Sequence, residues 1–286
     1  MQKRSSGAGR RRKPIGVFDS GMGGLTVLRE LTKKLPGEQF VYFGDTARAP
    51  YGNRSAQEIC RFAVEIGGFL LERDCKMLIF ACHTATVLGM AALTSITAKP
   101  VLGMVEAALA ETLGDPAEEA DPGADEAIWP VGMIATQGTA ESGDYQRFFA
   151  QRAPGKPFYM QACPDFVPLV EKGVLVGPDV ERAAEKHLSP LRERGIRTLV
   201  LGCTHYPFLV RPISAYFGAG VRLADPAHKL ALLAEQELAK RDLLADVRGK
   251  APKAPEYWCS GNPGRFNACG AILLGHALGQ VRMHVF

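Results

Sequence analysis

Short apolar runs alternate along the chain with longer stretches whose apolar residues recur at helical spacing. In the first part of the chain, residues 15–18, 40–43 and 77–81 form apolar runs that predict buried strands. Apolar residues recur every three or four positions over 25–34 and 56–73, which predicts a helix after each of the first two strands. This order predicts a parallel sheet with helices on both of its faces.

The same alternation begins again near Ile128 and continues through the second half. Predicted strands lie at 131–135, 158–161, 198–201 and 220–223, and predicted helices lie at 143–151, 179–194, 208–217 and 228–244. A turn-rich linker at 249–255 leads into a last strand and a closing helix near 266–278. Because this closing segment has no counterpart at the end of the first half, we expect it to pack back onto the first half.

These patterns predict an α/β protein of two pseudo-symmetric domains, each with a mostly parallel sheet flanked by helices. We expect residues 14–105 and 222–286 to form the first domain and residues 106–221 to form the second. Residues 114–126 contain six acidic residues, two prolines and no basic residue, so we expect an exposed loop there. Residues 1–13 contain six basic residues and no acidic ones, which predicts a disordered basic tail.

One short phrase occurs twice in the chain, at an offset of 121 residues. Residues 78–84 read LIFACHT, and residues 199–205 read LVLGCTH. A second pair of similar phrases, 15–21 and 131–136, lies at an offset of 116 residues, which indicates a weak internal duplication. Ligands of parallel α/β sheets bind just beyond the carboxyl ends of strands. The cysteine within each copy of the first phrase is therefore expected at one shared site between the two halves.

Composition and charge exclude several classes of partner. The chain has 286 residues, of which 47% are hydrophobic and 22% are charged, and no apolar run is long enough to cross a membrane. The formal net charge is +4, but outside residues 1–13 the chain has 28 basic and 30 acidic residues, so we expect no nucleic-acid partner. The seven cysteines include no C-x-x-C spacing, and no stretch resembles a secretion signal. These features predict a reduced, cytoplasmic protein.

Cys82 and Cys203 are the candidate catalytic residues, because a thiolate is a good base or nucleophile. An ordinary thiol pKa of about 8.5 leaves only a minority ionised at neutral pH, so each thiol needs neighbours that manage a proton. The polar candidates near the strand ends are Asp19, Ser20, Thr84, Glu171, Thr204 and His205. Two thiols that face each other across a cleft suit the removal of a proton from one face of a carbon and its delivery to the other face.

Two other chemistries fit parts of the pattern. Cys82-His83 and Cys203-x-His205 offer ligands that zinc accepts, although adjacent residues of an extended strand point to opposite faces. Cys203 and His205 could form the thiolate–imidazole pair of a cysteine hydrolase, which leaves Cys82 without a role. The glycine-rich turn at 20–24 has neither dinucleotide nor P-loop spacing, but its N–H groups at a helix start suit a carboxylate.

Five phrases carry a resemblance to a known family: PIGVFDSGMGGLT at 14–26, YFGDTARAPYG at 42–52, ACHTA at 81–85, VPLVE at 167–171 and LGCTHYP at 201–207. With these phrases, the chain resembles cofactor-independent glutamate racemases of the aspartate/glutamate racemase superfamily, from about residue 14 to the closing helix. The resemblance implies interconversion of L- and D-glutamate without a cofactor or metal, a supply of D-glutamate for peptidoglycan, and a homodimer. It also implies an active site in the cleft between the two domains.

The resemblance implies a role for each matching residue. Cys82, assisted by Asp19, would take the α-proton from D-glutamate. Cys203, assisted by Glu171 and His205, would take the α-proton from L-glutamate. The positions that would bind the substrate are Asp19, Ser20, Pro50, Tyr51, Gly52, His83, Thr84, Thr204 and His205.

His83 departs from the family pattern, which normally has asparagine after the first cysteine. As an imidazolium, His83 would attract a substrate carboxylate and depress the pKa of Cys82. As a bulkier side chain, it would crowd the pocket and shift preference to aspartate or another amino acid. A third alternative is a racemase-like binding or regulatory protein with impaired turnover. Pyridoxal-dependent racemisation is not expected, because no lysine occupies the motifs.

Overall fold

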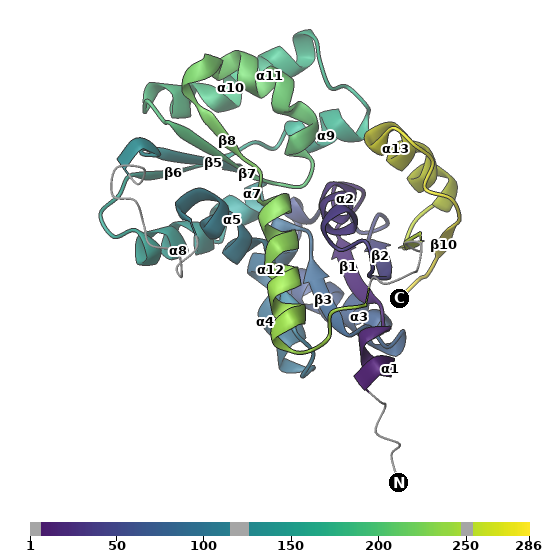
Figure 1. Ribbon diagram of the computed structural model, residues 1–286. Coiled ribbons are helices and arrows are strands. Elements are labelled where there is room, and N and C mark those ends of the chain that lie inside the picture. Colours follow the sequence, from purple (N-terminus) through teal and green to yellow (C-terminus); the bar gives the residue numbers. More distant parts are fainter. Residues whose placement is uncertain (1–6, 115–125, 247–253) are drawn as a thin grey trace.

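The computed structural model describes residues 7–114, 126–246 and 254–286, and these residues form two sheets covered by helices (Figure 1). The first sheet contains, in spatial order, β10 (Val281–Met283), β9 (Glu256–Cys259), β2 (Phe40–Gly44), β1 (Ile15–Asp19), β3 (Met77–Phe80) and β4 (Val101–Leu102). The second contains β6 (Phe158–Ala162), β5 (Val131–Ala135), β7 (Thr198–Gly202) and β8 (Arg222–Ala224). All neighbouring strands in these sheets are parallel, so the predicted fold class is confirmed.

Helices bury both faces of the first sheet. One face packs against α2 (Leu25–Lys34), α12 (Pro226–Lys240) and α13 (Pro263–Leu274), and the other packs against α3 (Ala56–Glu72) and α4 (His83–Ser95). Successive residues of β1 enter opposite cores, since Val17 belongs to the first and Phe18 to the second. A strand that is buried on both faces carries apolar residues on both of them, which is why β1 reads as a continuous apolar run as far as Asp19.

The second sheet repeats this arrangement. On one face lie α9 (Phe166–Glu171), α10 (Pro178–Glu193) and α11 (Val210–Phe217), and on the other lie α5 (Met104–Leu113) and α8 (Asp144–Arg152). Met133 and Ile134 of β5 again enter opposite cores. The short helix α7 (Gln137–Glu141) and the 3₁₀ turns η1 (Tyr51–Asn53), η2 (Tyr206–Leu209) and η3 (Gly218–Gly220) complete the connections.

The last part of the chain returns to the first sheet, where β9 pairs with β2 (Figure 1). The expected division at residues 221 and 222 needs correction, because β8 pairs with β7 and belongs to the second sheet. The expected division at residues 105 and 106 falls inside α5, which packs against α4 and α12 of one half and α8 of the other. The sequence pattern predicts where strands and helices form, but it does not show which of the two sheets each of them joins.

The expected disorder of residues 1–13 does not hold for residues 7–13. Gly7–Arg11 forms the helix α1, and Arg11 makes an ion pair with Asp242. The buried ammonium of Lys76 donates a hydrogen bond of 2.7 Å to the carbonyl of Arg11 and makes an ion pair with buried Glu38. Tertiary partners far along the chain therefore order a segment that looks solvated in sequence. Residues 1–6 lie outside the described residues.

Two other predicted segments fall mostly outside the described residues. These are the acidic loop, of which 115–125 are not described, and the linker, of which 247–253 are not described. Within the described segments, none of the helices combines the length and the hydropathy needed to span a bilayer.

Candidate active site

The carboxyl ends of β1, β3 and β7 meet at a small cavity between the two halves. The sequence-predicted residues that line it are Ser20, Pro50, Tyr51, Gly52, Cys82, His83, Thr84, Cys203, Thr204 and His205. Thr136 and Val167 also line it. The cavity holds about 20 Å³, which is enough for about one water molecule. A hollow of about 830 Å³ beside α10 and α11 is larger, but no cysteine lines it. The chemistry of the lining, and not its size, identifies the site.

Cys82 lies two residues after the end of β3 and caps the N-terminus of α4. Its Sγ accepts a hydrogen bond from the Ala85 N–H at 3.4 Å and donates to Ser20 Oγ at 3.7 Å. Burial, with a smaller contribution from the nearby Asp19 carboxylate, raises the pKa of Cys82 to about 12. In the ligand-free site this thiol is therefore protonated and ready to donate a proton.

Cys203 occupies the equivalent place after β7 and has a different set of neighbours. Its Sγ lies 3.8 Å from Nδ1 of His205, whose Nε2 lies 3.4 Å from Oε1 of Glu171. The contact between His205 and Glu171 is an ion pair without hydrogen-bond geometry. The buried Nε2 of His205 therefore has no hydrogen-bond partner among the described residues. Burial alone would lower the pKa of His205, but Cys203 and Glu171 together raise it to about 10. The Glu171 pKa is lowered by His205. A protonated imidazole beside a thiol favours the thiolate.

Asp19 ends β1 and connects the two halves. Its Oδ1 accepts a hydrogen bond of 2.9 Å from the Gly21 N–H, and its Oδ2 accepts one of 3.2 Å from the Thr204 hydroxyl. Burial raises the pKa of Asp19, and the positive charge of His205 opposes that rise. The carboxyl group is thus electrostatically coupled both to Cys82 and to His205.

Three threonine hydroxyls form a triangle across the interface between the halves. Thr84 Oγ1 lies 2.9 Å from the hydroxyls of both Thr136 and Thr139, which are 3.0 Å apart. Sequence reasoning did not single out Thr136 or Thr139. A signal for Thr136 existed, because the internal duplication aligns it with Ser20.

His83 is not the imidazolium that one of the expectations from the sequence describes. Its side chain is 2% exposed, and burial lowers its pKa to about 3. The ring is therefore neutral near pH 7, so it neither attracts a carboxylate as an imidazolium nor depresses the Cys82 pKa. Its Nδ1 lies 2.6 Å from the hydroxyl of Tyr145, which belongs to the other half of the protein.

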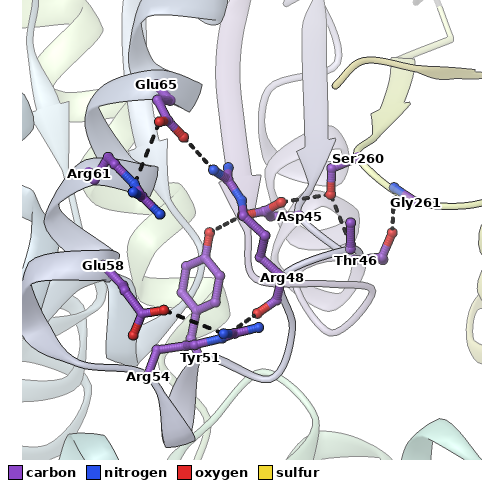
Figure 2. A network of polar contacts seen from close by, with 11 residues as sticks. Asp45, Thr46, Arg48, Tyr51, Arg54, Glu58, Arg61, Glu65, Ser260 and Gly261 are labelled. Atoms are coloured by element: carbon purple, nitrogen blue, oxygen red, sulfur yellow. Dashed lines mark hydrogen bonds and ion pairs between the residues drawn. The ribbon is translucent and has the colours of Figure 1, made fainter. Parts of the chain in front are cut away.

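A buried carboxylate holds the loop that carries Pro50, Tyr51 and Gly52 (Figure 2). Asp45 accepts hydrogen bonds from Ser260 Oγ at 2.6 Å, from Arg48 Nε at 2.7 Å and from the Tyr51 hydroxyl. Arg48 continues the network to Glu65 of α3. Ser260 follows β9, so this network joins the C-terminal segment to a wall of the cavity.

Comparison with known proteins shows the family. The model of the Asp/Glu/Hydantoin racemase family matches residues 15–234. The chain belongs to this family. Over 275 residues, this family member is 40% identical to the glutamate racemase of Thermoanaerobacter pseudethanolicus, a match that covers 96% of this chain and 97% of that protein. The predicted superfamily is therefore confirmed.

Solved racemase structures share the fold of this family member. One is the glutamate racemase from Thermus thermophilus in complex with beta-chloro-D-alanine, with 37% identity and a TM-score of 0.83. Another is the glutamate racemase from Francisella tularensis in complex with D-glutamate, with 31% identity and a TM-score of 0.84. Each match covers 96% of this chain and 98% of the other chain.

Replacing Asp45 of this racemase-family chain with asparagine is expected to lower the free energy of unfolding by roughly 3 kcal/mol, because it leaves Arg48 without its buried counter-charge. The loop from Pro50 to Gly52 would lose its anchor, so the KM for substrate should rise. Urea denaturation and steady-state kinetics measure the two effects. The matched control is Arg61→Gln, which removes the exposed ion pair with Glu65 and should change stability by less than about 1 kcal/mol. Equal effects of the two variants would contradict the anchoring role.

Proposed function

We propose that this chain is a glutamate racemase that interconverts L- and D-glutamate with two thiols and no cofactor. The observation that carries the proposal is the presence of Cys82 and Cys203 in one cavity, each at the carboxyl end of a strand from a different half. Relatives named glutamate racemase, two of them with 40% identity over almost the whole chain, support the choice of substrate.

The reaction moves one proton at each face of the α-carbon. With L-glutamate, the Cys203 thiolate takes the α-proton and becomes a thiol, while the electron pair of the broken C–H bond stays on the α-carbon. The Cys82 thiol then donates its proton to the opposite face and becomes a thiolate. With D-glutamate the two thiols exchange roles. Proton exchange with solvent restores the starting protonation states between turnovers.

The neighbours of each thiol differ in a way that suits this cycle. The high pKa of Cys82 keeps its proton in place until a carbanion forms, and Asp19 is placed to assist it. Cys203 and Glu171 raise the pKa of His205 to about 10, which places a positive imidazole beside the Cys203 sulfur that takes the α-proton from L-glutamate. The two thiols therefore have different polar neighbours, Asp19 beside Cys82 and His205 with Glu171 beside Cys203.

The hydroxyl and backbone groups of the cavity would bind the substrate's charged groups. We assign this role to Ser20, Pro50, Tyr51, Gly52, His83, Thr84, Thr136 and Thr204. The backbone N–H groups of residues 21–24 lie at the start of α2, where the helix dipole favours an anion. Since the cavity is much smaller than glutamate, the residues that line it must move apart to admit the substrate.

Incubation with L-glutamate in deuterated buffer, without pyridoxal phosphate or metal, tests the proposal. The α-proton signal should disappear while D-glutamate accumulates to an equal amount. Folded protein that exchanges no α-proton would refute the activity, and calorimetric binding of glutamate without exchange would instead support a binding or regulatory protein. A parallel incubation with aspartate tests the alternative substrate, which a faster rate on aspartate would favour.

The cellular setting is part of the same proposal. We place the enzyme in the cytoplasm, where it would supply D-glutamate for peptidoglycan as a homodimer. All seven cysteines are free thiols, which fits a reducing compartment. Sedimentation of the purified protein tests the oligomeric state.

A further inference from the structure

His83 and Tyr145 form a polar contact that connects the two halves at the cavity. His83 is the first residue of α4, and Tyr145 lies in the first turn of α8. The Nδ1 of His83 and the Tyr145 hydroxyl are 2.6 Å apart, and the side chains are 2% and 0% exposed. Which of the two groups donates depends on the tautomer of His83.

Both partners are neutral. Burial lowers the pKa of His83 to about 3 and raises the pKa of Tyr145 well above its ordinary value. A neutral imidazole has one N–H donor and one acceptor nitrogen, and the partner of one nitrogen decides which is which. Among the described residues, the Tyr145 hydroxyl has no second hydrogen-bond partner, so its single proton is available to His83 Nδ1.

Packing holds the Tyr145 hydroxyl in place. The ring belongs to the hydrophobic core on the α8 face of the second sheet, together with Trp129, Phe149 and Val200. His83, in contrast, lines the cavity that contains both thiols. A fixed donor on one half thus meets a cavity-lining acceptor on the other.

We propose that Tyr145 is a positioning residue that donates to His83 Nδ1, fixes the tautomer with its proton on Nε2, and so presents a neutral N–H donor to a carboxylate of the substrate. This inference rests on the proposed function for the identity of the carboxylate. It goes further by giving a role to Tyr145, which the motifs did not single out. It also explains how a histidine replaces the amide donor expected at this position.

Nitrogen-15 spectra of the histidine side chains test the tautomer directly. The chain has six histidines, and the resonances missing from the His83→Asn variant identify those of His83. In the ligand-free protein, His83 should have a protonated Nε2 and an unprotonated Nδ1. In Tyr145→Phe, the two nitrogens should shift towards the values of a mixed population of tautomers. A merely structural role for Tyr145 would leave these shifts unchanged.

Kinetics of the same variants test the link to the substrate. Tyr145→Phe should raise the KM for glutamate about fivefold to tenfold, as expected for one weakened hydrogen bond, and change kcat by less than about twofold. In the His83→Asn background, the same substitution should raise KM no further, because the two residues act as one unit. Tyr216→Phe, which removes a hydroxyl far from the cavity on α11, should change neither the spectra nor KM.

Two results would overturn the inference. One is a wild-type His83 with its proton on Nδ1, and the other is an equal rise in KM from Tyr145→Phe in both backgrounds. If the protein turns over no glutamate, the proposed function fails separately. The spectra still decide the tautomer, and the dissociation constant for glutamate from calorimetry then replaces KM in the same cycle.

Discussion

Replacing Cys82 or Cys203 with serine is expected to slow the racemisation of glutamate by a factor of about 10³. A serine hydroxyl is a far weaker acid than a thiol, so at neutral pH it neither forms the base nor donates as readily. Because the two enantiomers have equal free energies in solution, kcat/KM must fall equally in both directions for each variant. Circular dichroism, started in turn from L- and D-glutamate, measures both rates.

Cys60→Ser is the matched control for these substitutions. Cys60 lies in α3, where its Sγ donates to the Leu88 carbonyl at 2.9 Å, and it does not line the cavity. This variant should retain the wild-type rate. If either the Cys82 or the Cys203 variant racemised glutamate at the wild-type rate, the reaction would not need two thiols.

Gly23→Ala is expected to lower kcat/KM by about 100-fold, because the added methyl group displaces Thr204 and His205 at the site. A Cβ at this position would lie 2.4 Å from Thr204 Oγ1 and 2.5 Å from His205 Nδ1. Both contacts are far shorter than van der Waals distances, so the side chains of Thr204 and His205 must shift. A displacement of about 1 Å in catalytic groups is enough for a loss of this size. Steady-state kinetics on both enantiomers measure it.

Gly68→Ala serves as the control for the added methyl group. Gly68 lies inside α3, and a Cβ there would have no atom within 4 Å. Alanine favours a helix over glycine by up to about 1 kcal/mol, so this variant should be at least as stable as the wild type and equally active. An active Gly23→Ala variant would show that the close approach at Gly23 is not required for turnover.

The sequence predicts the central strands better than the edges of the sheets. β1, β3, β5 and β7 are buried on both faces, and their continuous apolar runs are visible without the structure. β4 has only two residues, and β10 is partly exposed, so neither has such a run. Their assignment as strands depends on neighbours that the local sequence does not reveal.

The site shows the same division between local and tertiary information. Cys82 and Cys203 could be proposed because each follows a buried strand at the same place in a repeated phrase. The neutral state of His83 could not be predicted from the sequence, because it follows from the burial of His83 against Tyr145, which is 62 residues away. The role of Asp45 was equally hidden, since Ser260 reaches it from the other end of the chain. Contacts between distant residues, and not residue types, determine these properties.

The chain passes between the two sheets twice, once from β4 to β5 and once from β8 to β9. A body attached at one point could swing in any direction, whereas one attached at two points rotates about the line that joins them. Two connections therefore restrict how one half can rotate against the other more than a single connection would. This restriction favours an arrangement in which Cys82 and Cys203 stay on opposite sides of the substrate's α-carbon, as inversion at that carbon requires.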